Sequence, residues 1–181
     1  QHMYMNGAEP KISIITPSFN SEKYIRQAIE SVKNQDYSNK EHIIIDGNST
    51  DRTVEICSQY ENLRVISEPD NGIYDALNKG LERSDGELIG WLNSDDVYTS
   101  KALTELAHAY VQNQECKLVR GSCEVVSNSR VCHRSKGEGK DRVGLRECSS
   151  RGKIDKGSMR KDGTRRGGRL LSRGLIGELR Y

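Results

Sequence analysis

Four short apolar runs, each followed by a segment with helical spacing, constrain the fold of this 181-residue chain more than any other feature. The runs are five or six residues long and rich in isoleucine, valine and leucine, which is typical of buried strands. They are Lys11–Thr16, Glu41–Asp46, Leu63–Ser67 and Glu87–Leu92. Apolar strands that alternate with helices indicate a mainly parallel sheet flanked by helices. The sequence therefore predicts an α/β fold.

The segments after these runs predict four helices, because their apolar residues recur at a period of 3.6. The helices are expected at about Tyr24–Val32, Asp51–Tyr60, Ile73–Leu81 and Leu103–Val111. Ser21 and Ser100 are the expected N-caps of the first and fourth helices. Pro17 is expected to end the first strand, because proline has no backbone N–H for the sheet. Two further short strands are expected at Lys117–Val119 and Glu124–Val126.

The composition of the chain changes near Val126. Residues 1–126 hold 12 Lys and Arg against 20 Asp and Glu, a net charge of −8, whereas residues 127–181 hold 16 against 6, a net charge of +10. Ten of the 17 glycines also fall in the second segment, where large apolar residues are sparse. Such a segment buries too little apolar surface to offset the entropy of ordering. We therefore predict a leader at residues 1–10, a patterned domain at 11–126 and a basic, low-complexity Gly/Ser/Arg-rich tail at 127–181 that is disordered or aberrant.

Three interpretations of this tail remain open. The abrupt change of composition favours an out-of-frame or otherwise aberrant segment. A basic arm could bind anionic lipid or nucleic acid, but its charges alternate with glycine and acids, which is more typical of a solvated segment. A metal site would use Cys123, Cys132, His133 and Cys148, whose spacing fits no usual zinc module. We therefore expect no specific nucleic-acid partner and at most peripheral membrane association.

The opening residues and the cysteines bear on the compartment. Gln1, His2 and Met3 look like a remnant of an expression vector, and we exclude them from the fold. We find no apolar run of bilayer-spanning length and no signal-peptide pattern. The five cysteines are odd in number and form no CxxC pair, so reduced thiols are expected. These features predict a cytoplasmic protein, with the inner face of the membrane as an alternative location.

Polar residues gather where each predicted strand ends. The four clusters are Pro17–Asn20, Asp46–Ser49, Glu68–Gly72 and Asn93–Asp96. In parallel sheets the ligand site lies beyond the carboxyl ends of the strands, so these clusters predict a polar, carboxylate-rich crevice. The sequence contains neither the GxGxxG nor the GxxxxGK[ST] motif, which disfavours a dinucleotide-dependent oxidoreductase and a P-loop enzyme.

Asp95 and Asp96 are the strongest candidates for a metal site. Two adjacent carboxylates repel each other and favour a hard cation such as Mg²⁺ or Mn²⁺, which would in turn hold a diphosphate. One alternative is that they cap the following helix, although Ser100 stands nearer to its start. The other alternative is a solvated turn.

Asp46 and the acidic loop that follows the third strand are further candidates. A carboxylate at the end of a strand can accept hydrogen bonds from a nucleobase or a ribose hydroxyl. A helix cap is the alternative for Asp46, although Ser49 and the two residues after it compete for that role. The acidic loop contains Glu68, Asp70 and Asp75, and its Asn71–Gly72 turn is equally well a structural stop.

Taken together, the segments ISIITPSFN, IIIDGNSTDRT, ISEPDNGIYDALNKGL and GELIGWLNSDDVY resemble, in order and spacing, the donor-binding half of family 2 glycosyltransferases of the GT-A fold. The subgroup resembled comprises bacterial sugar transferases of surface-polysaccharide assembly, and the match covers about residues 11–126. The resemblance implies a Rossmann-like GT-A sheet and a hexosyltransferase type of activity. Many members carry the first acid of a D-x-D motif where this chain has Asn93.

The resemblance also implies roles for individual residues. Thr16, Pro17, Ser18 and Glu22 would line the nucleotide, and Asp46 would meet the base with Ser49 close by. The segment Asp70–Asn78, with Gly72 and Asp75, would face the ribose and diphosphate. Asn93 and Asp95 would complete the nucleotide-sugar site, and Asp95 and Asp96 would hold Mg or Mn.

The reaction implied by the resemblance is a metal-dependent displacement at the anomeric carbon with inversion. The donor would be a nucleoside-diphosphate sugar, with a UDP-sugar favoured, and the acceptor would be a glycan or a lipid-linked molecule. A base is needed for the acceptor hydroxyl, but Glu138, Asp141 and Glu147 are more typical of solvated acids, so none is identified. The alternative is a nucleotide-sugar-binding module without turnover.

Overall fold

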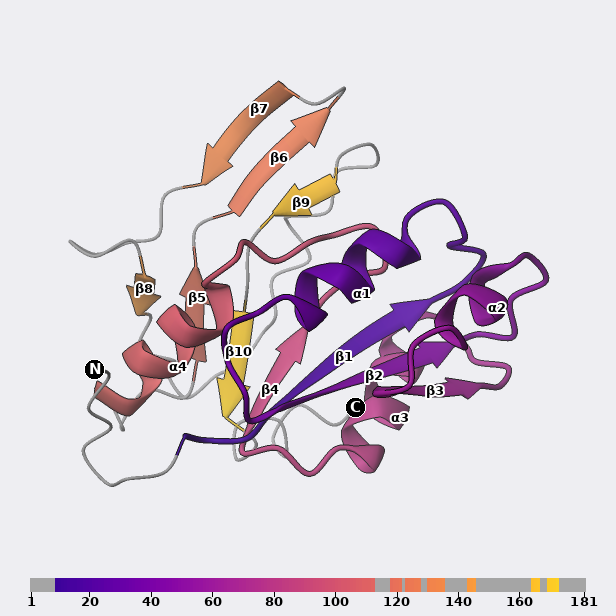
Figure 1. Cartoon of the computed structure of the whole chain (residues 1–181), viewed down its shortest axis with the longest axis horizontal. Helices are drawn as coiled ribbons and strands as arrows, with labels where there is room; N and C mark the ends of the chain where they lie inside the picture. The colour runs from indigo at the N-terminus through magenta and orange to yellow at the C-terminus, as the bar shows by residue number, and fades with distance from the viewer. Residues whose placement is uncertain are drawn as a thin grey trace.

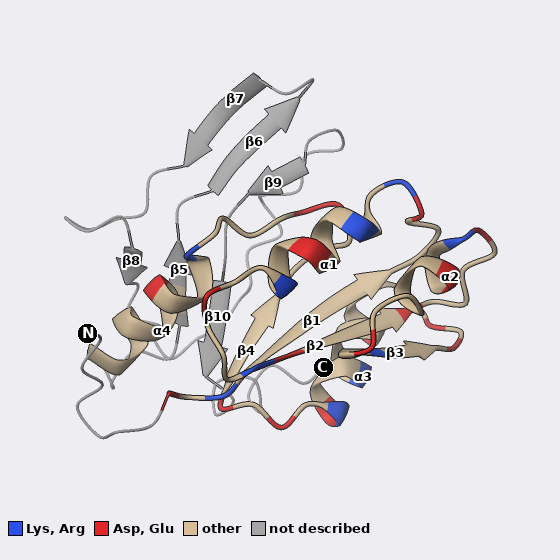
Figure 2. Ribbon diagram, in the orientation of Figure 1, with Lys and Arg blue, Asp and Glu red and all other residues tan. Residues whose placement is uncertain are grey.

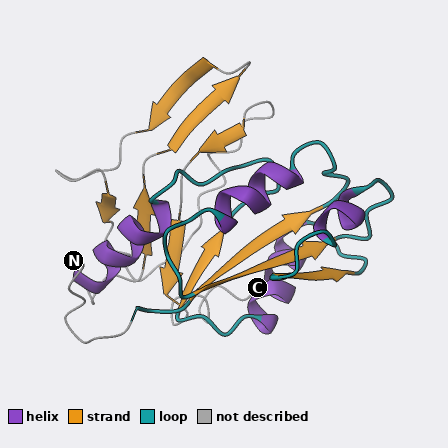
Figure 3. Cartoon of the chain, in the orientation of Figure 1, coloured by secondary structure: helices purple, strands orange, loops and turns teal. Residues whose placement is uncertain are grey.

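The computed structural model describes residues 9–112 and, beyond them, six short strands. In the first part, four strands alternate with four helices, as Figures 1 and 3 show. The elements are β1 (Ile12–Ser18), α1 (Ile25–Lys33), β2 (Lys40–Asp46), α2 (Thr53–Cys57), β3 (Leu63–Ser67), α3 (Ile73–Arg83), β4 (Leu88–Trp91) and α4 (Ala102–Gln112). The remaining strands are β5 (Leu118–Gly121), β6 (Cys123–Ser127), β7 (Arg130–Ser135), β8 (Val143–Leu145), β9 (Thr164–Arg166) and β10 (Arg169–Ser172).

The central sheet has the strand order β3-β2-β1-β4-β10-β5-β8. The first four strands are parallel to one another, which confirms the predicted α/β fold. β5 and β6 confirm the two further strands that the sequence predicted. β10 pairs antiparallel with both β4 and β5, and a second sheet has the order β7-β6-β9.

The strands β7 to β10 fall within residues 127–181, for which the composition predicts a disordered tail. Pairing of β10 with β4 was not expected from the sequence. Apart from Ser127 at the end of β6, the other residues of that segment lie outside the described part of the chain. The boundary at residue 126 and the disorder of the tail stay predictions.

Helices cover both faces of the parallel strands. On one face, Ile12 and Ile14 of β1 pack with residues of α1 and α4 in one buried cluster. On the other face, Ile15 of β1 packs with β2 residues and with Ala76 of α3. Successive residues of a strand point to opposite faces, which is why Ile14 and Ile15 enter different clusters. The layered core holds the carboxyl ends of the four strands at one edge.

Pro17 does not end the first strand, contrary to expectation. β1 continues to Ser18, and Pro17 pairs with Ile45 of β2. The pairing of β1 with β4 stops at Ile15, whose carbonyl accepts the N–H of Leu92. Pro17 lies two residues further on, so its nitrogen faces the side where β4 has ended and no N–H is needed. β1 therefore carries Ser18 to the edge of the sheet.

Two helix starts also differ from the prediction. α1 begins at Ile25, and its N-cap residue, Tyr24, makes no side-chain hydrogen bond. Ser21 contributes its carbonyl, which accepts the N–H groups of Tyr24 and Ile25 at 2.9 Å. α2 has only five residues and begins at Thr53. Just before each of these helices, a backbone N–H donates to a side chain of the other loop, Glu22 N–H to Asp51 and Arg52 N–H to Glu22.

Candidate functional site

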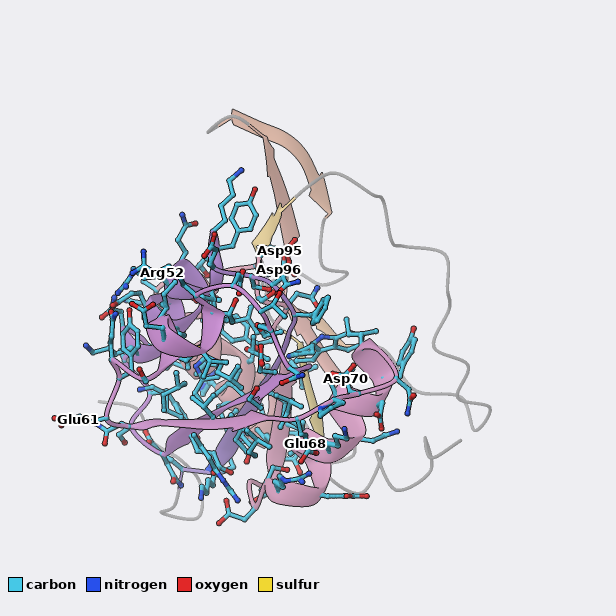
Figure 4. All side chains as sticks on the ribbon, turned by 90° about the vertical axis from the view of Figure 1, so that its right-hand side faces the viewer. Arg52, Glu61, Glu68, Asp70, Asp95 and Asp96 are labelled. Atoms are coloured by element: carbon cyan, nitrogen blue, oxygen red, sulfur yellow. The ribbon has the colours of Figure 1, made fainter. Side chains whose placement is uncertain are left out.

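Because β1 to β4 are parallel, the loops that follow them lie at one edge of the sheet. The loops after β1, β2 and β3 are on the right in Figure 1. Acidic residues recur in these loops, as Figure 2 shows. Figure 4 looks at this edge and shows Asp95 and Asp96 close together, with Asp70 on the same side of the molecule near α3. The structure therefore brings the predicted strand-end clusters to one rim.

The loop after β1 and the loop after β2 are joined by hydrogen bonds, and we call residues 18–22 and 46–53 the loop clasp. Asn20 N–H donates to Ser49 Oγ at 2.8 Å, and Asn20 Oδ1 accepts the N–H of Thr50 at 2.9 Å. Ser21 N–H donates to Thr53 Oγ1 at 2.8 Å. Asn20 has a φ of 47°, a left-handed conformation that asparagine tolerates. Side chains of one loop thus satisfy backbone groups of the other.

Glu22 and Asp51 extend the loop clasp. Glu22 N–H donates to Asp51 Oδ2 at 3.0 Å, and Glu22 Oε2 accepts the N–H of Arg52 at 3.1 Å. Burial alone would raise the pKa of Asp51, but hydrogen bonds from Thr53 and from the Glu22 amide lower it. Asp51 also accepts the N–H of Thr53, the first residue of α2. Glu22, which was expected to line the nucleotide, therefore uses its carboxylate within the clasp.

Asp46 is fully buried at the end of β2. Its carboxylate accepts the N–H of Ser49 at 2.9 Å, the Ser49 hydroxyl, and the hydroxyl of Ser67 at 2.7 Å. Asp46 therefore orders the turn after β2, while Asp51 bonds the start of α2. The contact of Asp46 with a nucleobase stays a prediction.

The predicted residues of β1 divide between the rim and the core. Ser18 is 6% exposed, and its hydroxyl has no hydrogen-bond partner within the described residues. Pro17 is buried beside it. Thr16 is 0% exposed, and its hydroxyl lies 2.9 Å from Nε2 of the buried His42. The Thr16 side chain therefore does not reach the rim, whereas the Ser18 hydroxyl, at the end of β1, is buried and has no partner within the described residues.

The loop between β3 and α3 is held against the loop clasp. Asp70 Oδ1 accepts the N–H of Gly72 at 2.8 Å. A Cβ added at Gly47 would lie 2.8 Å from Asp70 Oδ2, so the Asp70 carboxylate packs directly over this glycine. Gly72 has a φ of +105°, which favours glycine at the start of α3. Asp70 and Gly72 thus shape the loop, and Gly47 permits its close approach.

The start of α3 carries the rest of the predicted acidic loop. Asp75 Oδ2 accepts the N–H of Asn71 at 2.9 Å and lies 3.5 Å from Lys79 Nζ. The hydrogen bond from the Asn71 amide, supported by Lys79, lowers the pKa of Asp75 against the effect of partial burial. Lys79 also donates to the carbonyl of Pro69 at 2.6 Å. Asn78 is exposed on α3.

The loop of residues 93–96 follows β4. Asp95 is exposed and Asp96 is half-buried. Asn93 Oδ1 accepts the indole N–H of Trp91 at 2.9 Å, and Asn93 Nδ2 donates to Asp96 Oδ2 at 3.0 Å. Ser94 joins this loop to the loop clasp through a hydrogen bond between its Oγ and that of Ser21, 2.8 Å apart.

The donor set of this loop fits a hard cation only with ligands from elsewhere. Within the described residues, no group of three or more His, Cys, Asp or Glu side chains converges on one point. Mg²⁺ is commonly held by one or two carboxylates together with phosphates of a substrate. Asp95 and Asp96 match that pattern, with their carboxylates at the water-facing rim.

Three residues of the rim, Phe19, Asn20 and Asp51, were not predicted to have a role of their own in the site, although the first two lie in the strand-end cluster Pro17–Asn20. Phe19 is 63% exposed directly after Ser18, and a large aromatic within a polar strand-end cluster could have indicated it. Asn20 and Asp51 had no distinct signal, because their partners lie about 30 residues away. The acids Glu138, Asp141 and Glu147, none of which was identified as the base, lie outside the described part of the chain. So do the side chains of Cys123, Cys132, His133 and Cys148, whose spacing fits no usual zinc module. None of the described helices is long and apolar enough to span a bilayer.

Comparison with known proteins identifies related sequences. The family model described as glycosyl transferase family 2 matches residues 13–163, beyond the limit near residue 126 that the motifs suggested. The glycosyltransferase TuaG of Bacillus subtilis (strain 168), which its name assigns to teichuronic acid biosynthesis, is 38% identical over 104 residues. This alignment covers 55% of the chain and 41% of TuaG. An uncharacterized glycosyltransferase of Haemophilus influenzae is 38% identical over 109 residues, covering 58% of the chain and 44% of the relative. The chain thus spans less than half the length of these relatives.

Solved structures show the same fold. S. aureus TarS 1-349 in complex with UDP-GlcNAc aligns with a TM-score of 0.54 and 30% identity, covering 60% of this chain and 33% of TarS. A mannosyltransferase from Pyrobaculum calidifontis, in complex with GDP-Man and Mn²⁺, aligns with a TM-score of 0.55 and 23% identity. It covers 62% of this chain and 35% of the mannosyltransferase, and at that identity the likeness concerns the fold alone. These matches confirm the predicted GT-A fold.

Proposed function

The chain belongs to glycosyl transferase family 2, and on that premise we propose that it binds a nucleoside-diphosphate sugar, with a UDP-sugar favoured, at the carboxyl ends of β1 to β4. It transfers the sugar to a glycan or a lipid-linked acceptor. The observation that carries this proposal is the convergence of Ser18, Asp46, Asp70 and the Asp95–Asp96 pair on one rim. UDP-GlcNAc in the 30% identical TarS structure supports the choice of a UDP-sugar.

The nucleotide occupies the side of the rim formed by the loop clasp. The buried Ser18 hydroxyl has no partner within the described residues and can bond a ligand that reaches it, and the exposed ring of Phe19 offers an apolar face to a base. The buried Asp46 accepts the N–H of Ser49 in the turn after β2, and we propose that the base or ribose donates to the same carboxylate. Because loop geometry is held by hydrogen bonds before any ligand binds, little order has to be gained on binding.

Asp95 and Asp96 hold Mg²⁺ or Mn²⁺, with the remaining ligands supplied by the diphosphate. When bound, the cation neutralises the charge that develops on the leaving nucleoside diphosphate. Asp70, Gly72, Asp75 and Asn78 face the ribose and diphosphate. Asp70 keeps the β3–α3 loop close to the clasp, because its carboxylate accepts the N–H of Gly72 and packs over Gly47.

Transfer proceeds by direct displacement with inversion. The acceptor oxygen forms a bond to the anomeric carbon as the bond to the diphosphate oxygen breaks, and the acceptor proton passes to a base. No described residue is assigned as that base. We place the protein in the cytoplasm, with peripheral association at the inner face of the membrane when the acceptor is lipid-linked.

A thermal-shift screen of UDP, GDP, dTDP and CMP, each with Mn²⁺ or EDTA, tests the binding step. A ligand that binds only the folded protein must raise the apparent melting temperature. We expect the largest shift with UDP and Mn²⁺. Equal shifts with Mn²⁺ and EDTA would remove the cation from the proposal, and the absence of any shift would remove the nucleotide.

A second candidate function is nucleotide-sugar binding without turnover. It is favoured by the observation that the described residues supply a donor side but no assigned base. Release of UDP from a UDP-sugar, measured with and without glycan acceptors, separates the two functions. Acceptor-dependent release establishes a transferase, whereas tight binding without release establishes the binding module.

A further inference from the structure

Asn93 uses both ends of its side-chain amide. The indole N–H of Trp91 can only donate, so the Asn93 atom that faces it at 2.9 Å is the oxygen. The amide nitrogen then faces Asp96 Oδ2, an acceptor, at 3.0 Å. The Asp96 N–H also donates to the Asn93 carbonyl at 3.1 Å. The two side-chain contacts require the same orientation of the amide, so each one reinforces the other.

A carboxylate at position 93 could not make the same pair of contacts. It could still accept the Trp91 N–H, but it would present an acceptor to Asp96 where the amide presents a donor. Two carboxylates at this distance also repel each other. The asparagine is therefore matched to its two neighbours, one a donor and the other an acceptor.

Trp91 is held firmly enough to orient the amide. It is the last residue of β4 and pairs with Ile15 of β1 in the parallel sheet. Its ring makes an edge-to-face contact with Tyr74 of α3, with ring centroids 6.4 Å apart and planes at 70°. The chain of contacts from Trp91 through Asn93 to Asp96 thus links the sheet to a rim carboxylate.

We propose that Asn93 is a positioning residue for the cation site rather than a ligand of the cation. Its amide, oriented by Trp91, holds the Asp96 carboxylate in one orientation. Holding a ligand group in place before binding lowers the cost of binding. This inference rests on the proposed function, because it takes Asp95 and Asp96 as the residues that hold Mg²⁺ or Mn²⁺.

Two substitutions interrupt the chain of contacts at different points. Trp91→Phe removes the N–H but keeps an aromatic ring against Tyr74, and Asn93→Ala removes the amide. We expect each to weaken Mn²⁺ binding to the UDP complex by about tenfold, with UDP affinity in EDTA unchanged. Asn39→Ala is the matched control, since it also removes a side-chain amide, one that donates to the Glu9 carbonyl in the exposed segment before β2. Titration calorimetry measures both affinities.

Asn93→Asp separates positioning from ligation. If position 93 were a ligand position, the added carboxylate would tighten Mn²⁺ binding. We expect weaker binding, because the donor to Asp96 is lost. Tighter binding in Asn93→Asp, or unchanged Mn²⁺ affinity in both Trp91→Phe and Asn93→Ala, would overturn the inference while the wild type still showed metal-dependent UDP binding.

A metal-free readout keeps the test independent of the proposed function. The chain contains one tryptophan, so a ¹⁵N–¹H spectrum has one indole N–H signal. We expect Asn93→Ala to shift this signal and to speed its hydrogen exchange in EDTA, and Asn39→Ala to leave both unchanged. An unmoved signal overturns the chain of contacts itself. Wild-type UDP binding that is equal in Mn²⁺ and EDTA overturns the cation site, and the positioning role with it, even where the indole signal moves.

Discussion

The loop clasp and the loop of residues 93–96 lie at the same rim but are held in different ways. In the clasp, backbone N–H groups from both loops are satisfied by side chains of the opposite loop. In the 93–96 loop, side-chain hydrogen bonds run along one short segment, from Trp91 to Asn93 to Asp96, and one further bond joins Ser94 to the clasp. Asp95 is exposed. One side of the rim is therefore held by bonds between two loops, whereas the other is held mainly within one loop and presents the Asp95 carboxylate to solvent.

Because of this difference, the clasp and the 93–96 loop contribute to ligand binding in different ways. A loop whose polar groups are already paired recognises a ligand by shape and by its few unused groups, such as the Ser18 hydroxyl. A pair of adjacent carboxylates gains most when a cation relieves their repulsion. We therefore expect changes in the clasp to alter both stability and nucleotide binding, and changes in the 93–96 loop to alter mainly the metal dependence.

The largest effect is expected for Asp46→Asn. The buried carboxylate accepts hydrogen bonds from Ser49 and Ser67, and an asparagine would turn an NH₂ group toward one of these donors. We expect the free energy of unfolding to fall by about 1.5–3 kcal/mol, with a loss of UDP affinity. Urea denaturation without metal and calorimetry with UDP measure the two quantities. Asp36→Asn, an exposed carboxylate bonded to Thr104, is the control. An unchanged urea midpoint would contradict the role of Asp46 in the clasp.

Asp96→Ala should lower the metal-dependent affinity for UDP without lowering stability. Because the carboxylate lies at the polar rim, its loss should leave the melting temperature of the metal-free protein nearly unchanged. UDP affinity in Mn²⁺ should fall to its value in EDTA, a loss of about tenfold or 1.4 kcal/mol. Glu61→Ala is the control, since Glu61 is exposed in the loop between α2 and β3. Retention of the wild-type Mn²⁺ effect in Asp96→Ala would place the cation elsewhere.

The buried pair of Thr16 and His42 predicts that the free energy of unfolding depends on pH. Burial lowers the pKa of His42 from 6.5 to about 3, so the folded protein keeps this imidazole neutral. The unfolded chain binds the proton below about pH 6.5, so stability is lost as the pH falls through that value. We expect a loss of about 1 kcal/mol between pH 7 and pH 5.5.

Urea midpoints over that pH range measure this effect of His42. His42→Gln should remove the pH dependence. His108→Gln, a change at an exposed histidine of α4, should retain it. A wild-type pH dependence in His42→Gln would show that other groups produce it.

The smallest effect is expected where the two regions meet. Ser21 Oγ and Ser94 Oγ lie 2.8 Å apart, so Ser94→Ala removes a bond between the clasp and the 93–96 loop. We expect the strengthening of UDP binding by Mn²⁺ to shrink by about 0.5–1 kcal/mol. A double-mutant cycle with Ser21→Ala measures the coupling, and Ser58→Ala at an exposed site is the control. Strictly additive effects of the two substitutions would show that the two regions bind independently.

Much of the architecture followed from local patterns. The four parallel strands and the four helices were predicted because β-branched runs and a 3.6-residue spacing are properties of neighbouring residues. Pro17 was the exception at a strand boundary. Whether proline is tolerated depends on where β4 stops pairing with β1, and that is decided by a strand more than 70 residues away.

The sequence by itself determined that acidic and polar residues would stand at the ends of four parallel strands, and hence that they would share one rim. Only the tertiary structure decided which of them remain available there. Asp51 and Glu22 are engaged within the clasp, Asp46 is buried among serine donors, and Thr16 turns into the core against His42. The physical reason is that each of these contacts joins loops or strands that adjacent positions in the sheet bring together. A hydrogen-bond partner about 30 residues away leaves no local pattern in the chain, although it decides what a carboxylate can still bind.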